Sequence, residues 1–270
     1  MSGEPVRLTT QHVDFRVLYA PGTTNELFLM VRDGDARTNY AATNVVLVVR
    51  PPAETTLPEG FPEFGQAGSP FWILPASQNP ELLYLGVSGE GLPSGVFAGS
   101  PEVQLIGVRA PGDFFAWRFD PSGSLELFMD SRNGIGPDDR IPAPVGGHGH
   151  FNWGFSSNGW FEVTFRVVGR LAGATTNLLA ADTPFRFAVE PLPPEPAAAT
   201  LSVLEAGSDS LACRLTGSPG VSYQIELSSD LGSWRKGTAV RGAVDPVDFT
   251  VPLPGPGQCY LYVRAVAGVD

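Results

Sequence analysis

Residues 161 to 167 read Phe161-Glu162-Val163-Thr164-Phe165-Arg166-Val167 and alternate strictly between apolar and polar side chains. Successive side chains of a β-strand point to opposite faces of a sheet, so this alternation predicts a strand with one buried face and one face toward water. The expected core side consists of Phe161, Val163, Phe165 and Val167. Such a strand indicates a β-sheet that packs on one side against a core.

Similar strand-like runs recur along the first 190 residues, and turn-forming residues separate nearly all of them. The 270-residue chain contains 32 glycines and 26 prolines but only 17 lysines and arginines, which is typical of short strands joined by frequent turns. We therefore expect an all-β protein, with a large β-sandwich followed by a small immunoglobulin- or fibronectin-III-like β-sandwich. The other strands expected in the larger part are Phe15–Tyr19, Leu27–Val31, Val45–Val49, Val103–Val108, Phe114–Phe119, Leu125–Met129 and Phe185–Val189.

A proline-rich segment divides the chain after residue 190. It has four prolines between residues 191 and 196, which favour an extended spacer. We expect a large domain over residues 1–190, a linker over 191–198 and a small domain over 199–270. In the small domain, Tyr223, Ile225 and Leu227 are expected in the core, and Trp234 either caps that core or binds a surface ligand. The strands expected there are Thr200–Leu204, Leu211–Leu215, Ser222–Leu227, Asp248–Val251 and Cys259–Val266.

The formal net charge of −11 restricts the classes of partner. Nucleic-acid binding needs clustered lysine and arginine to neutralise phosphates, so we expect neither nucleic acid nor an anionic membrane surface as a partner. No run of 18 apolar residues occurs, so no membrane span is expected. The start, Met1-Ser2-Gly3-Glu4-Pro5, lacks the basic and apolar segments of a signal sequence, and we interpret it as a mature or recombinant beginning.

The two cysteines, Cys213 and Cys259, lie in segments of the small domain that alternate like strands. If both face inward, they can form a disulfide in an oxidising compartment. The alternative is that both are buried thiols acting as small apolar groups. No Cys-x-x-Cys motif occurs, which argues against redox catalysis and against a zinc ribbon.

All three histidines lie in two short polar motifs, His12-Val13-Asp14 and Gly147-His148-Gly149-His150-Phe151-Asn152-Trp153. In an extended second motif, His148, His150 and Asn152 share one face, and the two aromatic residues take the other. Alternate side chains start about 6.6 Å apart, which two imidazoles can close to reach one ion at about 2.0–2.1 Å.

The first motif places His12 and Asp14 on one face of a strand in the same way. If that strand lies beside the second motif, His12, His148, His150 and Asp14 form a metal site, with Asn152 and Trp153 as candidate ligand-binding residues. The alternative is a framework in which the rings bond to backbone carbonyls. Sequence alone does not place residue 12 beside residue 148.

A set of motifs between Leu8 and Val189 resembles the surface-anchored-protein domain, or choice-of-anchor M domain, of exported bacterial proteins. Gln11 stands where glycine is usual before the first histidine. The segment Ser222–Leu231 with Trp234 resembles, more loosely, the fibronectin-type-III-like modules of secreted bacterial proteins. The motifs that carry the first resemblance are His12-Val13-Asp14, Phe71-Trp72-Ile73-Leu74-Pro75, Leu82–Gly86, Pro111-Gly112-Asp113-Phe114, His148–Phe155 and Gly159–Phe165.

The resemblance implies an extracytoplasmic protein that handles metal, because members of this family are often found alongside metal-type ABC transporters. A metal-transport system or another cell-envelope component is then the expected partner. The family's histidine motifs fall on His12, His148 and His150. Secreted, cell-surface and periplasmic locations all fit this implication, and we expect neither a signal nor an anchor sequence within these residues.

Three classes of function follow from these observations. The first is a metal-binding module, with zinc expected first and copper or manganese as alternatives. The second is an adhesion or glycan-binding module that presents Trp72, Trp117, Trp153 or Trp160 to a sugar ring. The third is a zinc hydrolase with an open coordination position, for which the sequence identifies no general acid or base. We expect the first class and a role without catalysis.

Overall fold

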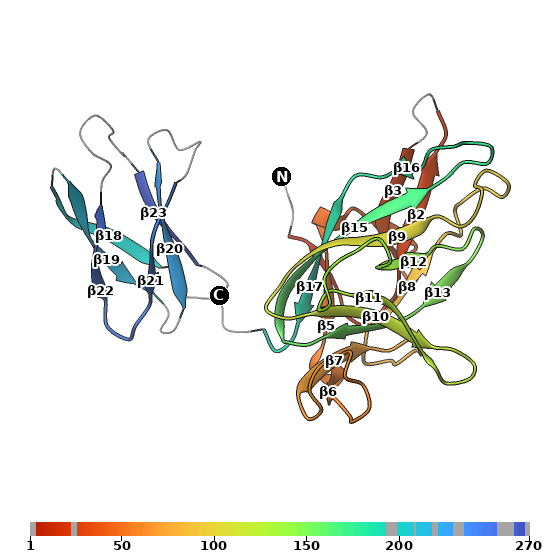
Figure 1. Cartoon of the computed structure of the whole chain (residues 1–270), viewed down its shortest axis with the longest axis horizontal. Coiled ribbons are helices and arrows are strands. Elements are labelled where there is room, and N and C mark those ends of the chain that lie inside the picture. The colour runs from red at the N-terminus through yellow and green to blue at the C-terminus, as the bar shows by residue number, and fades with distance from the viewer. Residues whose placement is uncertain are drawn as a thin grey trace. The chain divides into compact units, whose positions relative to one another are not determined.

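The computed structural model describes residues 4–22, 26–192, 199–207, 209–217, 221–228, 235–252 and 262–267 of the chain. The chain divides into two compact units, Met1–Pro193 and Pro194–Asp270, and the boundary falls within the proline-rich segment. Regular structure in the described residues consists of strands and two short 3-10 turns, Ala42–Asn44 and Pro51–Ala53 (Figure 1). The prediction of an all-β protein is confirmed.

Three sheets build the larger unit. A seven-stranded sheet has the order β1 (Val6–Leu8), β5 (Val45–Val49), β17 (Thr183–Val189), β15 (Gly159–Gly169), β9 (Glu102–Arg109) and β12 (Arg140–Pro142), with β16 (Leu178–Leu179) also paired to β15. The histidine sheet has the order β13 (His148–His150), β8 (Tyr84–Ser88), β2 (His12–Ala20), β3 (Glu26–Asp33) and β4 (Thr38–Tyr40). The third sheet has the order β11 (Leu125–Asp130), β10 (Phe114–Phe119), β14 (Asn152–Phe155), β7 (Pro70–Leu74) and β6 (Glu54–Thr56).

The core of the larger unit lies where the three sheets meet. Phe15, on the histidine sheet, packs edge-on against Phe165 and Phe185 of the seven-stranded sheet, with ring centroids 5.1 and 4.9 Å away. It also packs against Trp153 of the third sheet at 5.6 Å. Aromatic rings bury large apolar areas and favour such edge-to-face contacts. This cluster fixes the inner face of the histidine sheet and so leaves its outer face for other roles.

Strand β15 confirms the interpretation of the alternating stretch. Its exposure alternates along all eleven residues, and Phe161, Val163, Phe165 and Val167 are 1% exposed or less. Each of these side chains joins the common core. The predicted period was therefore a reliable guide to which side of this strand is buried.

The smaller unit contains two three-stranded sheets. Its core includes Tyr223, Ile225 and Leu227, as predicted from their alternation, whereas Trp234 lies outside the described residues. The first sheet has the order β18 (Thr200–Ala206), β19 (Ser210–Thr216) and β22 (Val247–Pro252). The second has the order β21 (Arg235–Arg241), β20 (Ser222–Ser228) and β23 (Tyr262–Ala267).

Cys213 corrects the expectation of a disulfide. Its side chain is completely buried and its thiol is free, so the predicted bond to Cys259 is not formed at this residue. Cys259 itself lies outside the described residues. Cys213 packs with Leu215 and Val251 in the small core, which is the role of a small apolar group. Burial raises the pKa of this thiol and keeps it protonated.

Candidate metal centre

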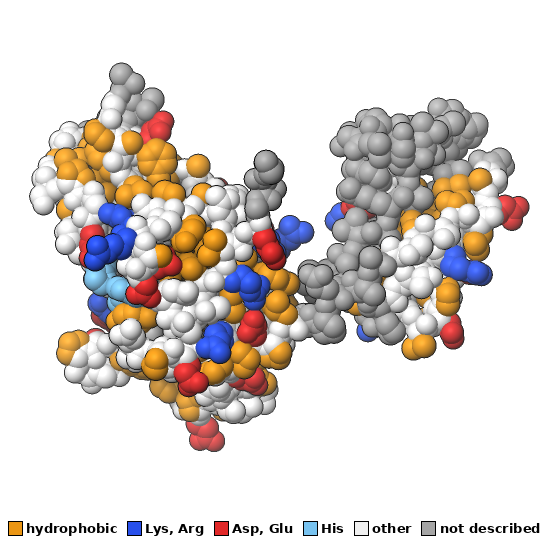
Figure 2. Space-filling model, turned by 180° about the vertical axis from the view of Figure 1, so that it is seen from behind, with side chains coloured by type: hydrophobic (Ala, Val, Ile, Leu, Met, Phe, Trp, Pro, Cys, Tyr) orange, Lys and Arg blue, Asp and Glu red, His pale blue; other side chains and the backbone are white. Residues whose placement is uncertain are grey.

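Strand pairing brings the two histidine motifs onto one face of the histidine sheet. β2 runs parallel to β8 with His12 opposite Tyr84, and β8 runs antiparallel to β13 with His148 opposite Ser88. Side chains of paired residues point to the same face of a sheet. The alternate residues of these strands, such as Phe15, face the core, so the histidines stand on the outer face. Figure 2 shows histidine side chains reaching the surface of the larger unit between basic and acidic groups.

The three imidazoles lie close enough to share one ion. One nitrogen from each of His12, His148 and His150 lies within 4.8 Å of the other two. The ring centroids are separated by 5.0 to 5.6 Å. Tetrahedral zinc with bonds of about 2.0–2.1 Å needs nitrogens roughly 3.4 Å apart, which small rotations of the rings can provide. The structure thus brings these three residues together as the sequence motifs predicted.

Gly86 provides the space in which two members of the site approach each other. It lies in the middle strand, paired with Asp14 on one side and with His150 on the other. A Cβ atom at this position would lie 2.4 Å from Asp14 Oδ1, 2.8 Å from the carbonyl oxygen of Gly149 and 3.0 Å from His150 Cε1. Any side chain here would displace the carboxylate or the ring, so glycine is a structural requirement of the site.

Several buried polar atoms of the site lack a hydrogen-bond partner among the described residues. They are His12 Nε2, Asp14 Oδ1 and both ring nitrogens of His150. An unpaired buried polar atom costs about 1–3 kcal/mol, so such atoms rarely gather in one place without a function. The carbonyl oxygen of Leu85, beside His150, accepts a hydrogen bond from Trp153 Nε1 at 3.0 Å. A framework held by carbonyls therefore does not account for His12 Nε2, and the one carbonyl that acts on His150 is that of Leu85.

Aromatic stacking orients His150. Its ring lies parallel to that of Tyr84, with 3.5 Å between centroids and 5° between planes. The Tyr84 ring also lies 5.2 Å from the His12 ring, at a tilt. Tyr84 therefore supports two of the three imidazoles from the middle strand.

Glu90 orients His148, and the sequence did not identify it. His148 Nδ1 donates a hydrogen bond to Glu90 Oε1 at 2.8 Å, which leaves Nε2 with a free lone pair. A carboxylate that holds one imidazole nitrogen while the other faces an ion is a common arrangement in metal sites. Glu90 follows β8 in a tight turn, and only the pairing of Ser88 with His148 reveals its proximity.

Burial determines the protonation of the inner part of the site. Burial, with a contribution from His12 and His148, lowers the pKa of His150 to about 4, against an opposing effect of the Leu85 backbone. His150 is therefore neutral at pH 7 and can act as a ligand. Burial also raises the pKa of Asp14, although the nearby His12 and His148 rings oppose this shift.

Asp14 lies beside the three-histidine group. Its Oδ2 atom is 3.7 Å from His12 Nε2, and the residue is only 5% exposed. Its carboxylate is not among the atoms that all lie within 4.8 Å of one another. The geometry therefore gives three imidazole ligands with a buried carboxylate next to them.

The structure separates Asn152 from the histidines. β13 ends at His150 and pairs with β8, whereas β14 begins at Asn152 and pairs with β7 and β10 of the third sheet. The prediction that Asn152 shares the histidine face is wrong, because the chain changes sheets at Phe151. The Asn152 side chain accepts a hydrogen bond from the Ala76 amide and donates one to the Trp117 carbonyl.

The tryptophans proposed as sugar platforms are mostly inaccessible. Trp153 is fully buried, and Trp72 and Trp117 are 5% and 4% exposed, so none of them offers a ring face to a ligand. Trp160 is half-buried, and the guanidinium of Arg186 covers its ring at 4.6 Å. These positions disfavour the glycan-binding interpretation.

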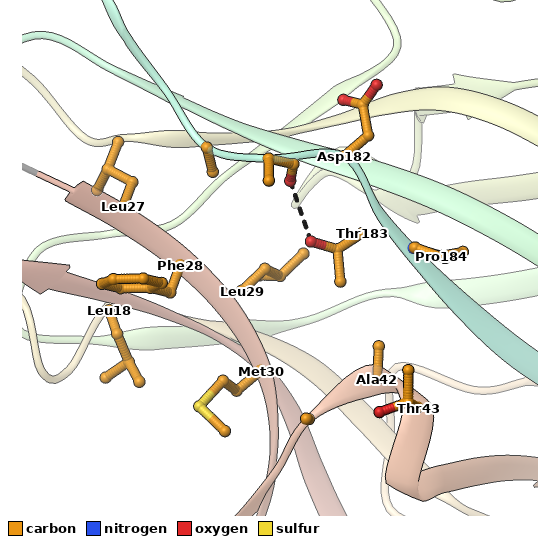
Figure 3. A pocket seen from close by; sticks show the side chains of 13 residues that line it. Leu18, Leu27, Phe28, Leu29, Met30, Ala42, Thr43, Asp182, Thr183 and Pro184 are labelled. Carbon is orange, nitrogen blue, oxygen red and sulfur yellow. Dashed lines mark hydrogen bonds between the residues drawn. The ribbon is translucent and has the colours of Figure 1, made fainter.

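A separate apolar cavity lies away from the histidines. Its volume is about 460 Å³. Thr183 lines it, and the hydroxyl group of Thr183 donates a hydrogen bond to the Ala181 carbonyl oxygen at 3.0 Å (Figure 3). The carboxylate of Asp182, at its border, forms two hydrogen bonds with Arg166. Among the described residues that line this cavity, Asp182 is the one titratable side chain. Its lining residues include Leu18, Leu27, Phe28, Leu29, Met30, Ala42, Thr43 and Pro184.

Comparison with protein families and with curated proteins finds no family model and no relative that matches this chain. Within the described part of the chain, no helix has the length and apolar character needed to cross a membrane. The class of protein defined by the fold and the site is therefore an all-β protein with a cluster of three histidines on the outer face of one sheet.

Proposed function

We propose that the larger unit binds a divalent transition-metal ion through His12, His148 and His150. The observation that carries this proposal is the presence of unpaired buried nitrogens in a group of imidazoles within 4.8 Å of one another. A cation accepts the lone pairs that the fold leaves unused. Binding of the ion then removes the energetic cost of leaving these buried atoms unpaired, which makes the binding free energy more favourable.

The donor set favours zinc, with copper as the principal alternative. Neutral imidazole suits zinc and copper. Manganese prefers oxygen ligands, and Asp14 is the only oxygen donor proposed for this site. Asp14 serves either as a fourth ligand or as a partner that balances the charge of the ion. Glu90 fixes the tautomer of His148 from outside the ligand set.

The resemblance to the choice-of-anchor M domain extends this proposal to the biology of the chain. It supports a location outside the cytoplasm, as a secreted, cell-surface or periplasmic protein. A metal-transport system is the proposed partner, with the ion as the cargo that the larger unit receives or delivers. The smaller unit, with its resemblance to fibronectin-type-III-like modules, is proposed as a spacer or attachment unit.

Titration calorimetry on the full chain without a histidine tag tests the metal site. We expect one zinc ion to bind per chain, and the combined substitution of His12, His148 and His150 by alanine to abolish binding. Glu162→Gln, on the seven-stranded sheet, serves as a control with an intact site. Equal binding by the triple variant, or no binding of zinc, copper, nickel or manganese by the wild type, would refute the proposal.

A further inference from the structure

One unpaired atom beside the metal centre is a donor, and a cation does not satisfy it. Arg16 Nε is buried and has no hydrogen-bond partner among the described residues. The remaining contact of this guanidinium is a long one, from Nη1 to Asn39 Oδ1 at 3.5 Å. Arg16 also takes part in no ion pair among the described residues. Arg16 as a whole is partly exposed, but its buried Nε needs an acceptor, and preferably an anionic one.

Arg16 and the metal centre lie on the same face of the histidine sheet, and both contact the turn that follows β8. Arg16 lies opposite Ser88, and Ser88 lies opposite His148, so all three point outward in one row. The turn after β8 contacts both ends of this row. Glu90 binds the His148 ring, and a Cβ at Gly91 would lie 3.1 Å from Arg16 Nη2. Two strand spacings, about 9.6 Å, separate the backbones of Arg16 and His148.

The charges on this face also call for an anion. A divalent ion held by neutral imidazoles, together with Arg16 and with Arg32 opposite Asp14, carries more positive charge than Asp14, Glu90 and Asp35 neutralise. With Asp14 as a charge-balancing neighbour outside the group of three imidazoles, these ligands leave at least one coordination position for a ligand from solution. Guanidinium groups match carboxylates and phosphates because both present two oxygens to the parallel N–H bonds.

We propose that a small oxyanion, a carboxylate or a phosphate group, binds to the metal ion and to Arg16 together. This inference rests on the proposed metal site. One oxygen occupies the coordination position left by the three histidines, and another accepts the hydrogen bond from Arg16 Nε. The ion and the arginine thus select an anionic partner or cargo ligand.

Cobalt-loaded full chain provides the test, because cobalt(II) absorbs visible light according to its ligands. We would titrate it with sodium acetate and, separately, with inorganic phosphate, in perchlorate and a non-coordinating buffer. We expect a saturable spectral change with at least one of the two anions. Arg16→Gln should weaken that anion at least about tenfold, with the affinity for cobalt changed less than about threefold, because a hydrogen bond to a charged group contributes about 1.5–3 kcal/mol. Arg109→Gln, which removes an equal charge from the seven-stranded sheet, should leave both affinities unchanged.

The outcomes separate the two proposals. A response to acetate alone identifies a carboxylate ligand, and a response to phosphate alone identifies a phosphate ligand. Normal cobalt binding without an anion effect, or an Arg16→Gln variant that binds anions like the wild type, overturns the anion proposal and leaves the metal site standing. Failure of the wild type to bind cobalt, zinc or copper overturns both.

Discussion

The two faces of the histidine sheet differ in the side chains that strand β2 presents to them. On β2, Val13 and Phe15 face the core with none of their surface exposed, and they pack against apolar neighbours. On the other face, His12, Asp14 and Arg16 carry buried polar atoms that have no hydrogen-bond partner in the described part of the chain. The inner face stabilises the fold, whereas the outer face contains buried polar atoms that a ligand could satisfy. Unpaired polar atoms on a well-packed support are typical of functional sites.

This contrast implies that the inner face positions the outer one. The backbone of β2 is held by parallel pairing to β8, antiparallel pairing to β3 and the aromatic core beneath it. The histidines can therefore remain near one another although His12 Nε2 and the ring nitrogens of His150 lack hydrogen-bond partners among the described residues. A variant on the inner face should change stability, and a variant on the outer face should change binding.

Phe15→Ala is expected to have the largest effect on stability. The ring contacts Phe165, Phe185 and Trp153, so its removal leaves a cavity at the junction of the three sheets. Substitutions of this kind cost about 3–5 kcal/mol of unfolding free energy. Chemical denaturation of the metal-free protein measures this loss. A loss below about 1 kcal/mol would contradict the central position of Phe15 in the core.

Zinc should stabilise the protein through the outer face. An ion that binds only the folded state at 100 times its dissociation constant adds about 2.7 kcal/mol to the unfolding free energy. Thermal unfolding should shift upward with zinc and return to its original position with a chelator. The variant that lacks all three histidines should not respond. A shift of equal size in that variant would place the ion elsewhere.

The sequence predicted those features that depend on local alternation. The buried side of β15 followed from the period of Phe161 to Val167, and the shared face of His148 and His150 followed from their spacing. The proximity of His12 was predicted from the scarcity of histidine and from the resemblance. The first two inferences succeeded because a strand repeats every two residues, whatever lies beside it.

The rest depended on strand pairing between distant segments, which alternation does not encode. Asn152 has the correct spacing to join the histidines, but the chain passes to another sheet at Phe151. Gly86 and Glu90 join the site because β8 lies between β2 and β13. Neither residue stands near a histidine in the sequence, so only the order of strands in the histidine sheet reveals them.

Glu90→Gln should weaken zinc binding with little change in stability. The carboxylate accepts the His148 Nδ1 proton, and its loss allows the imidazole to turn and to change tautomer. Outer partners of this kind contribute about 10- to 100-fold to metal affinity. Because Glu90 is exposed, we expect the lower end, about tenfold. Calorimetry should show the effect in Glu90→Gln but not in Glu126→Gln, which removes a carboxylate paired with Arg118 on the third sheet.

The smallest expected effect is the pH dependence of the metal-free protein. The pKa of His150 is lowered to about 4 in the folded state. As the pH falls below about 6.5, this histidine therefore takes up a proton in the unfolded chain but stays neutral in the folded chain. Stability should therefore decrease between about pH 6.5 and pH 4 and then level off, by roughly 1–2 kcal/mol because the ring is partly exposed. The raised pKa of Asp14 acts in the opposite direction at the acid end.

His150→Gln isolates this contribution, because it removes the titrating ring and leaves Asp14 in place. The difference in unfolding free energy between the wild type and this variant should change with pH only below about 6.5. A constant difference from pH 7.5 to pH 4 would mean that the His150 ring is protonated as easily in the folded protein as in the unfolded chain. The outer face would then lack the buried, unpaired imidazole that distinguishes it from the inner face.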